Sequence, residues 1–326
     1  MRAMILSAGY GTRLWPLTED RSKPAIPILG KPLVGYVAEY LARYGCDEIV
    51  VNLHHRSGSV RRALGDGSTF KVKLHYVEEP EILGTSGGID NARALLDDET
   101  FIVVNGKIIT DIDLNAALET HRRTAALATL VVLPNPSCER FSLVKAKEGL
   151  LEGFGGMPNP GDYVGKDPPL MFTGIQILEP NIFDYIPRGV FSHSTTDVYP
   201  QALAKGERIA VHVAEGHWYE LSTIKRYLDI SLQLLAATGT DTSKGSDCRI
   251  SASAEVHEAI LWDNVIVEDG ARVRRAVLAD NVRIPAGSLI GNEAVVCASL
   301  VEGKEPPAKA LKGELRGDNF VVSLAE

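Results

Sequence analysis

Short apolar runs alternate with longer amphipathic stretches over residues 1 to about 235. Compact apolar runs predict strands, and apolar residues spaced three or four apart predict helices. The predicted strands are Ala3–Ser7, Glu48–Leu53, Lys71–Glu78, Phe101–Asn105 and Ala128–Leu133. The predicted helices between them are Leu33–Tyr44, Gly88–Leu96 and Leu114–Arg123. This alternation predicts an α/β domain with a Rossmann-like, doubly wound, mostly parallel sheet, whose ligands bind at the carboxyl ends of the strands.

The last part of the chain has a different and shorter period. Apolar residues are spaced five or six apart, and the spacing repeats every 17 residues, as from Val256 to Val273. The repeating positions are Ile250, Val256, Leu261, Val267, Val273, Leu278, Ile284 and Ile290. Small and turn-forming residues lie between them, which predicts a parallel β-helix of about two and a half coils. Phe320–Val322 is expected to pack back as a final strand.

The composition is that of a folded, water-soluble protein. The chain has 326 residues, of which 45% are hydrophobic and 23% are charged, close to the averages for globular proteins. At roughly 100–200 residues per domain, this length predicts two domains. A connector rich in Thr, Gly, Ser and Asp sets the boundaries. We expect a first domain over residues 1–237, a linker over 238–248 and a β-helix domain with its C-terminal tail over 249–326.

Charge and cysteine usage exclude several classes of function. The formal net charge is −8 and no run is rich in Lys or Arg, which argues against a nucleic-acid partner. The four cysteines are scattered without a C-x-x-C pair, so neither a zinc site nor a disulfide framework is indicated. The apolar run Ala3–Leu6 is too short for a signal peptide or a membrane span. We therefore expect a cytoplasmic protein without a membrane partner.

A glycine-rich loop directly follows the first predicted strand. It contains Ser7, Ala8, Gly9, Gly11 and Thr12, and continues to Arg13, Leu14 and Lys23. Glycines after a first strand let backbone N–H groups approach a polyphosphate, and the nearby Arg and Lys neutralise its charge. The loop is not a Walker A motif, and Leu14 stands where a dinucleotide fingerprint has its third glycine. The pattern therefore predicts a phosphate cradle of another type.

The whole string resembles the opening motif of the sugar-1-phosphate nucleotidylyltransferases, also called NDP-sugar pyrophosphorylases. Their motif reads G-x-G-T-R-L-x-P-L-T, then K-P, then G-K-P, and it matches Gly9–Thr18, Lys23–Pro24 and Gly30–Pro32. Further similarities are Glu81–Gly88, Asn105–Gly106, Thr110–Asp111, Thr173–Ile175 and Thr196–Pro200. The chain resembles in particular the mannose-1-phosphate guanylyltransferase-like members, which carry a C-terminal left-handed β-helix. The resemblance covers nearly the whole chain.

This resemblance implies an enzyme that forms an NDP-sugar and pyrophosphate from a nucleoside triphosphate and a sugar 1-phosphate. In-line transfer of this kind depends on positioning and charge neutralisation. The resemblance implies that Arg13 stabilises the β- and γ-phosphates and that Lys23 bridges the α-phosphate and the sugar phosphate. It implies nucleotide binding by Ser7, Ala8, Gly9, Gly11, Thr12, Glu79, Gly84, Thr85 and Gly106, and sugar-phosphate binding by Asn105, Thr173, Gly174 and Asp197.

Glu79 indicates which nucleotide base the protein binds, because the resemblance places it where thymidylyl and uridylyl relatives use a glutamine to read the base. A carboxylate only accepts hydrogen bonds, which suits the N1–H and N2–H₂ donors of guanine better than the edge of uracil or thymine. This favours GTP, with mannose 1-phosphate or a related hexose or heptose phosphate as acceptor. The alternative is that Glu78 or Glu79 faces solvent at the end of the strand and reads no base.

Three positions depart from the family pattern. The family usually has Asn-Gly-Asp, whose aspartate binds the catalytic Mg²⁺, whereas this chain has Lys107 after Gly106. The second metal aspartate is replaced by Glu220, which can still ligate a hard cation through oxygen. The sugar-binding F-x-E-K-P string is replaced by Phe154–Pro158, in which Gly156 and Met157 carry no charge.

Two interpretations follow from these departures. In the first, the chain is an enzyme in which Lys107 acts at the α-phosphate and partly replaces the cation, while Asp111, Asp113 or Glu220 rebuilds a shifted Mg²⁺ site. In the second, the chain binds a nucleotide or nucleotide-sugar without turnover, as a regulatory or scaffold homologue. The retained Arg13 and Lys23 favour the first. In both, the open coils of the β-helix predict a homo-oligomer.

Overall fold

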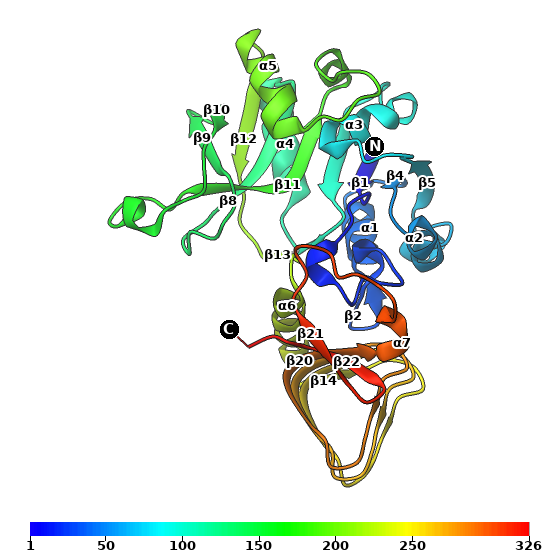
Figure 1. Ribbon diagram of the computed structural model, residues 1–326. Helices are drawn as coiled ribbons and strands as arrows, with labels where there is room; N and C mark the ends of the chain where they lie inside the picture. Colours follow the sequence, from blue (N-terminus) through cyan, green and yellow to red (C-terminus); the bar gives the residue numbers. More distant parts are fainter. Residues whose placement is uncertain (326) are drawn as a thin grey trace. The chain divides into compact units, whose positions relative to one another are not determined.

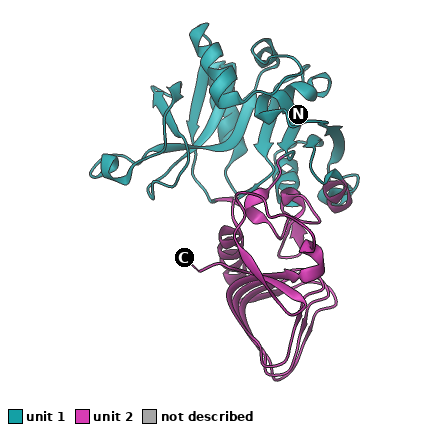
Figure 2. Ribbon diagram, in the orientation of Figure 1, with its two compact units in different colours: residues 1–8, 34–57, 64–218 teal, residues 9–33, 58–63, 219–326 magenta. Residues whose placement is uncertain are grey.

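The computed structural model describes residues 1–325, which form two compact units (Figure 2). Unit 1 comprises Met1–Ala8, Val34–Ser57 and Leu64–Trp218. Unit 2 comprises Gly9–Leu33, Gly58–Ala63 and residues 219–325. This division differs from the predicted boundary at residue 237, because the glycine-rich segment Gly9–Leu33 packs with the C-terminal region rather than with the strand that precedes it.

Unit 1 is built on a nine-stranded sheet with the order β5-β4-β1-β6-β11-β8-β12-β10-β9 (Figure 1). β5, β4, β1 and β6 run parallel to one another, whereas β11 runs antiparallel to both β6 and β8. The strands are β1 (Arg2–Leu6), β4 (Glu48–Leu53), β5 (Lys73–Glu78), β6 (Phe101–Asn105), β8 (Ala128–Pro134), β9 (Leu143–Lys147), β10 (Leu150–Phe154), β11 (Leu170–Leu178) and β12 (Ile209–Val213). The predicted α/β class, with a mostly parallel central sheet, is confirmed.

The order of the strands reverses at β1. The chain runs from β1 to β4 and β5 on one side, and then returns to place β6 on the other side of β1. In doubly wound sheets, a ligand crevice forms at this switch point, outside the carboxyl ends of the two strands. Ser7 directly follows β1, and Asn105 is the last residue of β6.

Helices of unit 1 pack on the sheet. They are α1 (Leu33–Arg43), α3 (Gly84–Asn91), α4 (Leu114–Thr124) and α5 (Tyr199–Ala204). α4 begins where the Asp113 side chain accepts a hydrogen bond from the N–H of Asn115, an ordinary N-cap. α3 starts at Gly84, four residues before the predicted start at Gly88, because the carbonyl of Ser192 accepts hydrogen bonds from the first turn. That contact is tertiary, so the local pattern did not reveal it.

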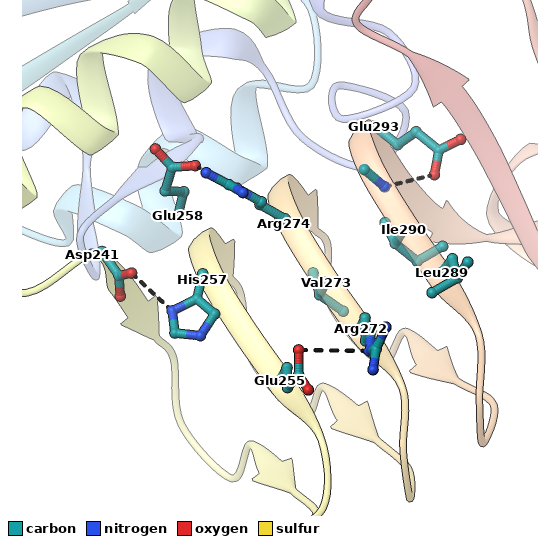
Figure 3. Close-up of a pocket in the computed structure, with 11 residues that line it drawn as sticks. Asp241, Glu255, His257, Glu258, Arg272, Val273, Arg274, Leu289, Ile290 and Glu293 are labelled. Atoms are coloured by element: carbon teal, nitrogen blue, oxygen red, sulfur yellow. Dashed lines mark hydrogen bonds and ion pairs between the residues drawn. The ribbon is translucent and has the colours of Figure 1, made fainter.

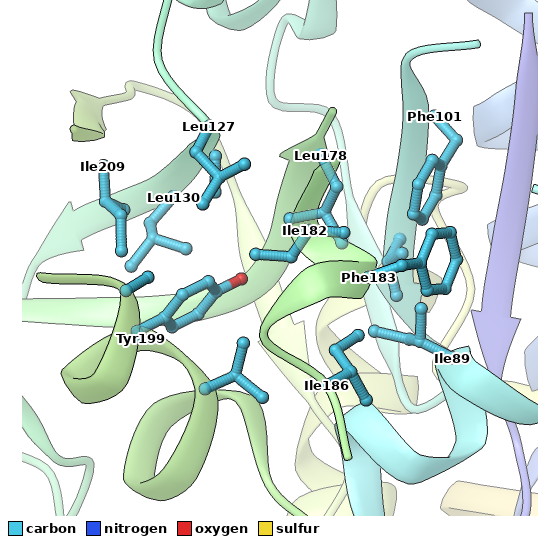
Figure 4. Close-up of a cluster of buried hydrophobic side chains, with 14 of the residues drawn as sticks. Ile89, Phe101, Leu127, Leu130, Leu178, Ile182, Phe183, Ile186, Tyr199 and Ile209 are labelled. Atoms are coloured by element: carbon cyan, nitrogen blue, oxygen red, sulfur yellow. The ribbon is translucent and has the colours of Figure 1, made fainter. Parts of the chain in front are cut away.

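The main apolar cluster of unit 1 lies between these elements and the sheet (Figure 4). Ile89 of α3 and Tyr199 of α5 contribute from the helices, and Leu130 and Leu178 contribute from β8 and β11. Phe101 of β6 stacks on Phe183 with ring centroids 5.7 Å apart. Burial of aromatic and aliphatic side chains on this scale is the main stabilising term of such a domain. It supports the strands whose ends form the crevice.

Most of unit 2 is a parallel β-helix whose coils repeat every 17 residues. Val256 pairs with Val273 and Val273 with Ile290 on one face, and Val267 pairs with Ile284 on another. The larger sheet has the order β14-β16-β18-β20-β22-β21 and the smaller one the order β15-β17-β19. The strands are β14 (Thr242–Lys244), β15 (Arg249–Ile250), β16 (Glu255–Leu261), β17 (Ile266–Val267), β18 (Arg272–Leu278), β19 (Arg283–Ile284), β20 (Leu289–Cys297), β21 (Gly313–Arg316) and β22 (Asn319–Ser323). The predicted repeat is confirmed.

Two features at the ends of the β-helix refine the sequence prediction. β14 lies inside the segment predicted as a linker, where its backbone pairs in parallel with β16. The predicted final strand is present as β22, which pairs antiparallel with β20. The other elements of this unit are α6 (Ile224–Ala236) and α7 (Ala298–Val301). α2 (Ser57–Leu64) and β13 (Trp218–Glu220) lie at the division between the units, and β2 (Pro27–Ile28) and β3 (Lys31–Pro32) form a small hairpin in unit 2.

One face of the larger β-helix sheet carries cross-strand ion pairs (Figure 3). Glu255 of β16 faces Arg272 of β18 at 3.6 Å, and the charged groups of Glu258 and Arg274 lie 3.2 Å apart. Exposed pairs of this kind contribute little to stability individually. They line an open groove of about 820 Å³, beside which Leu289 remains 71% exposed. Within residues 1–325, no helix has both the length and the apolar character needed to cross a membrane.

Candidate functional site

Gly106 lies at the switch point of the sheet in unit 1, where β1 and β6 end. Its N–H donates to the carbonyl of Leu6 at 2.9 Å, which joins the ends of β6 and β1. A Cβ at position 106 would lie 2.5 Å from Ser7 Oγ and 2.9 Å from the Leu6 carbonyl oxygen, so only glycine fits. The Ser7 hydroxyl is buried and has no hydrogen-bond partner within residues 1–325. A polar group left in this state favours a role toward a bound molecule.

A buried hydrogen-bond network ties the ends of three parallel strands together. The Asn52 side chain, at the end of β4, accepts from the N–H of Ser7 at 2.7 Å and donates to Glu79 Oε1 at 2.6 Å. The second carboxylate oxygen of Glu79 accepts from the N–H of Leu83 at 3.0 Å. Glu79 is only 2% exposed. Both carboxylate oxygens of Glu79, the predicted base-reading residue, therefore accept hydrogen bonds from the protein itself. This arrangement favours a role in which Glu79 positions the Leu83–Gly84 turn.

Gly84 and Thr85 lie at the start of α3, against the segment that contains His193. Gly84 has φ +77°, and a Cβ there would lie 2.4 Å from the carbonyl oxygen of Ser192. Thr85 Oγ1 accepts from the N–H of Ser194 at 2.9 Å. The turn for which nucleotide binding is predicted therefore depends on a close backbone approach that only a glycine permits.

A pocket of about 240 Å³ opens beside the carboxyl end of β6. It brings together the predicted residues Thr85, Asn105 and Gly174. The remaining lining is aliphatic at Leu6 and otherwise aromatic or polar: Phe141, Ser142, Phe154, Phe172, Gln176, His193, Ser194 and Thr195. A Cβ on Gly174, whose φ is +81°, would lie 2.0 Å from Asn105 Nδ2. The close approach of Gly174 and Asn105 therefore shapes this wall of the pocket.

Two predicted sugar-phosphate residues do not line this pocket. Thr173 is 1% exposed, and its hydroxyl donates to the carbonyl of Val131 at 2.7 Å. Asp197 accepts from the backbone N–H of His193 at 2.6 Å, so it orders the His193 segment instead. Phe141, Phe172 and His193 line the pocket but were not predicted as site residues. They come from distant segments, and only Phe154, at the start of the altered F-x-E-K-P string, gave a local signal.

The glycine-rich loop of unit 2 has its own internal geometry. Gly11 has φ +68° and precedes the 3-10 helix η1 (Thr12–Leu14), which carries Arg13 on its exposed side. A Cβ at position 11 would lie 2.8 Å from the Cβ of Lys23. Leu14 is 1% exposed and faces the interior of the unit, which explains why the third glycine of a dinucleotide fingerprint is absent here. The loop is thus tightly folded around Lys23.

Lys23 is a buried cation. Its side chain is 11% exposed, and Nζ lies 4.0 Å from Oε1 of Glu220, whose side chain is 3% exposed. Removing charged groups from water is costly unless they are paired, so this ion pair offsets part of the cost of burying the two side chains. Glu220, predicted as a metal ligand, therefore has a protein cation close to its carboxylate.

The residues present do not fit a Mg²⁺ site of the family type. Lys107 places an ammonium group where the family has a carboxylate, and a hard divalent cation requires oxygen ligands. Asp111 Oδ2 is bonded to His217 Nδ1 at 2.8 Å, and Oδ1 accepts from the His217 N–H. Burial raises the pKa of Asp111, but these bonds to His217 outweigh it and hold the pKa below its usual value. Across residues 1–325, no cluster of three or more His, Cys, Asp or Glu side chains is arranged to hold a metal ion.

The fold defines a protein with a mixed α/β domain and a parallel β-helix. The family described as Nucleotidyl transferase matches residues 2–237, and the family described as GlmU-like, C-terminal hexapeptide matches residues 240–298. The chain therefore belongs to the nucleotidyl transferase family, and the predicted resemblance to sugar-1-phosphate nucleotidylyltransferases is confirmed.

Individual relatives differ in the substrates that their names state. The chain is 36% identical to an N-acetylmuramate alpha-1-phosphate uridylyltransferase of Neisseria meningitidis, over 69% of this chain and 95% of that protein. It is 28% identical to a UTP–glucose-1-phosphate uridylyltransferase of Synechocystis, over 92% and 81%, and 28% identical to a mannose-1-phosphate guanylyltransferase of Mycobacterium tuberculosis, over 83% and 76%. The crystal structure of HddC from Yersinia pseudotuberculosis shares the fold, with a TM-score of 0.62 at 22% identity, over 72% of this chain and 99% of that one.

Proposed function

We propose that this protein transfers a nucleotidyl group from a nucleoside triphosphate to a sugar 1-phosphate and releases pyrophosphate. A phosphate oxygen of the sugar phosphate forms the new bond to the α-phosphorus, and the bond from that phosphorus to the pyrophosphate oxygen breaks. Such transfer requires cations to neutralise developing charge more than it requires covalent help from the protein. The observation that carries the proposal is the glycine-rich loop, which exposes Arg13 and packs closely against Lys23 at Gly11.

Within this proposal each group of residues has a distinct task. Arg13 neutralises the β- and γ-phosphates and the leaving pyrophosphate, and Lys23 neutralises the α-phosphate. The buried Ser7 hydroxyl and the close strand ends at Gly106 support nucleotide binding. The pocket around Asn105, Gly174 and Phe172 takes the sugar, whose ring packs against aromatic faces and bonds to neutral polar groups.

We further propose GTP and mannose 1-phosphate as the first substrate pair to test. The M. tuberculosis relative bears that activity in its name, whereas the 36% identical Neisseria relative is named a uridylyltransferase. Pyrophosphate release measured for GTP, UTP, dTTP, CTP and ATP against a panel of hexose 1-phosphates, including N-acylated ones, separates these activities. Release with any pair supports the proposed reaction, and the preferred pair identifies the substrates.

Non-catalytic binding is the second candidate function, and Lys107 at the family's metal position favours it. Lys107→Asp distinguishes the two. We expect the unmodified protein to release pyrophosphate in the presence of EDTA, because its donor set does not fit Mg²⁺ and its lysines supply the positive charge. Lys107→Asp should make turnover depend on added Mg²⁺. Nucleotide-sugar binding without turnover in the unmodified protein, with activity only in the variant, would instead support the non-catalytic interpretation.

Glu79→Gln tests the predicted reading of guanine. Because both carboxylate oxygens accept hydrogen bonds from Asn52 and Leu83, we expect the variant to lose about 1–3 kcal/mol of stability. We also expect kcat/KM to fall by a similar factor for all five nucleotides. A fall confined to GTP would contradict this expectation and identify Glu79 as the residue that reads the base. Thermal unfolding and the nucleotide panel measure the two effects.

We infer a homo-oligomer that forms through the β-helix, because its larger sheet exposes alternating charges and the Leu289 side chain (Figure 3). Sedimentation velocity of the full chain tests this.

A cytoplasmic location is proposed from the nucleotide substrates and from the four cysteines, none of which forms a disulfide within residues 1–325.

A further inference from the structure

The segment that carries Arg13 and Lys23 is anchored on the β-helix through Arg21. The Arg21 guanidinium bonds to the carboxylate of Asp280, which lies between β18 and β19, and its carbon lies 4.7 Å from the ring centroid of Trp262. It also bonds to both carboxylate oxygens of Asp20 at 2.8 and 2.9 Å. Burial lowers the pKa of Arg21, but the hydrogen bonds and charges of Asp20 and Asp280 raise it well above the ordinary value.

The β-helix side of this contact is itself held firmly. The other oxygen of Asp280 accepts from the N–H of Asp263 in the preceding coil at 3.0 Å. Trp262 is 4% exposed, and its indole N–H donates to Tyr227 Oη at 2.9 Å. The Tyr227 hydroxyl in turn donates to the carbonyl of Pro27 at 2.7 Å. The loop segment is therefore held on both sides of Lys23, at Arg21 by Asp280 and Trp262 of the β-helix and at Pro27 by Tyr227 of α6.

Short stretches of chain connect these contacts to the two cations, Arg13 and Lys23. Ser22, between Arg21 and Lys23, is fully buried and its N–H donates to Ser59 Oγ at 2.9 Å. Lys23 opens the 3-10 helix η2 (Lys23–Ala25). On the Arg13 side, Trp15 packs edge-on against Phe320 of β22 with centroids 5.4 Å apart. Both ends of the loop thus rest on residues that belong to the C-terminal region.

We propose that the β-helix contributes to the transfer reaction by positioning Lys23. Asp280 and Trp262 form a clamp that holds Arg21 in place, and Arg21 in turn fixes the position of Lys23. Arg21 is a positioning residue, because it acts on the loop and not on substrate. The inference rests on the proposed function, since it assigns the β-helix a role in that same reaction. A displacement of about 1 Å at a reacting group can cost about 100-fold in rate, so loss of the clamp has a measurable consequence.

Asp280→Asn in the full-length protein is the direct test, because it removes the charge and keeps the shape. We expect kcat to fall about 10- to 100-fold with a smaller change in KM, as loop misplacement affects the reacting geometry most. Hydrogen–deuterium exchange of residues 9–33 should rise. Asp280→Glu, which restores the carboxylate, should recover part of the activity. Glu255→Gln, which removes an exposed ion pair on the same β-helix, is the matched control.

The outcomes separate the clamp from the proposed reaction. If Asp280→Asn matches Glu255→Gln in kcat and in loop exchange, the clamp has no positioning role and the inference is wrong. If the unmodified protein shows no turnover, the proposed reaction fails, and exchange of residues 9–33 together with the Kd for GTP still tests the clamp. Should Asp280→Asn fail to fold, Arg21→Lys replaces it, because lysine keeps the charge but loses the bidentate bond to Asp20 and the planar stacking on Trp262.

Discussion

Replacing Lys23 by methionine is expected to lower kcat about 100- to 1,000-fold, the range observed when one preorganised charge-stabilising group is removed from an active site. Lys23 is the buried cation of the glycine-rich loop, and Gly11 approaches it so closely that a Cβ there would lie 2.8 Å away. A methionine has a similar length and no charge, so the variant removes electrostatic stabilisation while it keeps most of the packing. Steady-state pyrophosphate release measures the effect.

Lys244→Met is the matched control, because Lys244 lies in the same unit on β14 and is exposed. It should change kcat by less than about twofold, in line with surface substitutions far from a site. Lys23→Met also leaves the buried Glu220 carboxylate without this cation, so thermal unfolding must accompany the kinetics. If the single variant is unfolded, Lys23→Met with Glu220→Gln removes both charges. A folded variant with unchanged kcat would exclude Lys23 from the reaction.

Gly174→Ala is expected to raise the KM for the sugar 1-phosphate about tenfold or more, while the Kd for the nucleotide changes little. An alanine at φ +81° costs roughly 1–2 kcal/mol in backbone strain, and its Cβ would lie 2.0 Å from Asn105 Nδ2. Asn105 must then move, and with it one wall of the pocket. Initial rates at varied sugar phosphate, nucleotide titration calorimetry and the melting temperature measure the three consequences.

Gly189→Ala provides the control for backbone strain alone. Gly189 has φ +64°, but no atom lies within 4 Å of a Cβ built there. It should therefore lose a similar increment of stability from strain, without the added effect on sugar-phosphate KM. Equal KM values for the two variants would contradict the assignment of the pocket around Asn105 and Gly174 to the sugar.

The parts of the fold with strict local periodicity could be predicted from the sequence. A 17-residue repeat returns each apolar residue to the same face of a β-helix, so Val256, Val273 and Ile290 had to stack. The glycine positions of the candidate site were equally visible, because Gly106 directly follows one predicted strand and Gly11 lies in the glycine-rich loop after another. The start of α3 was not, since it depends on the carbonyl of Ser192, more than a hundred residues away in sequence.

The sequence by itself determined the α/β class, the β-helix repeat and the phosphate loop, because each depends on the spacing of neighbouring residues and on backbone conformations that few residue types adopt. Only the tertiary structure showed that Glu79 is bonded on both oxygens, that phenylalanines from three segments line one pocket, and that Arg21 is gripped by Asp280, 259 positions away. Such contacts depend on how the helices and strands pack together. Local sequence patterns do not indicate them, because the two side chains lie far apart along the chain.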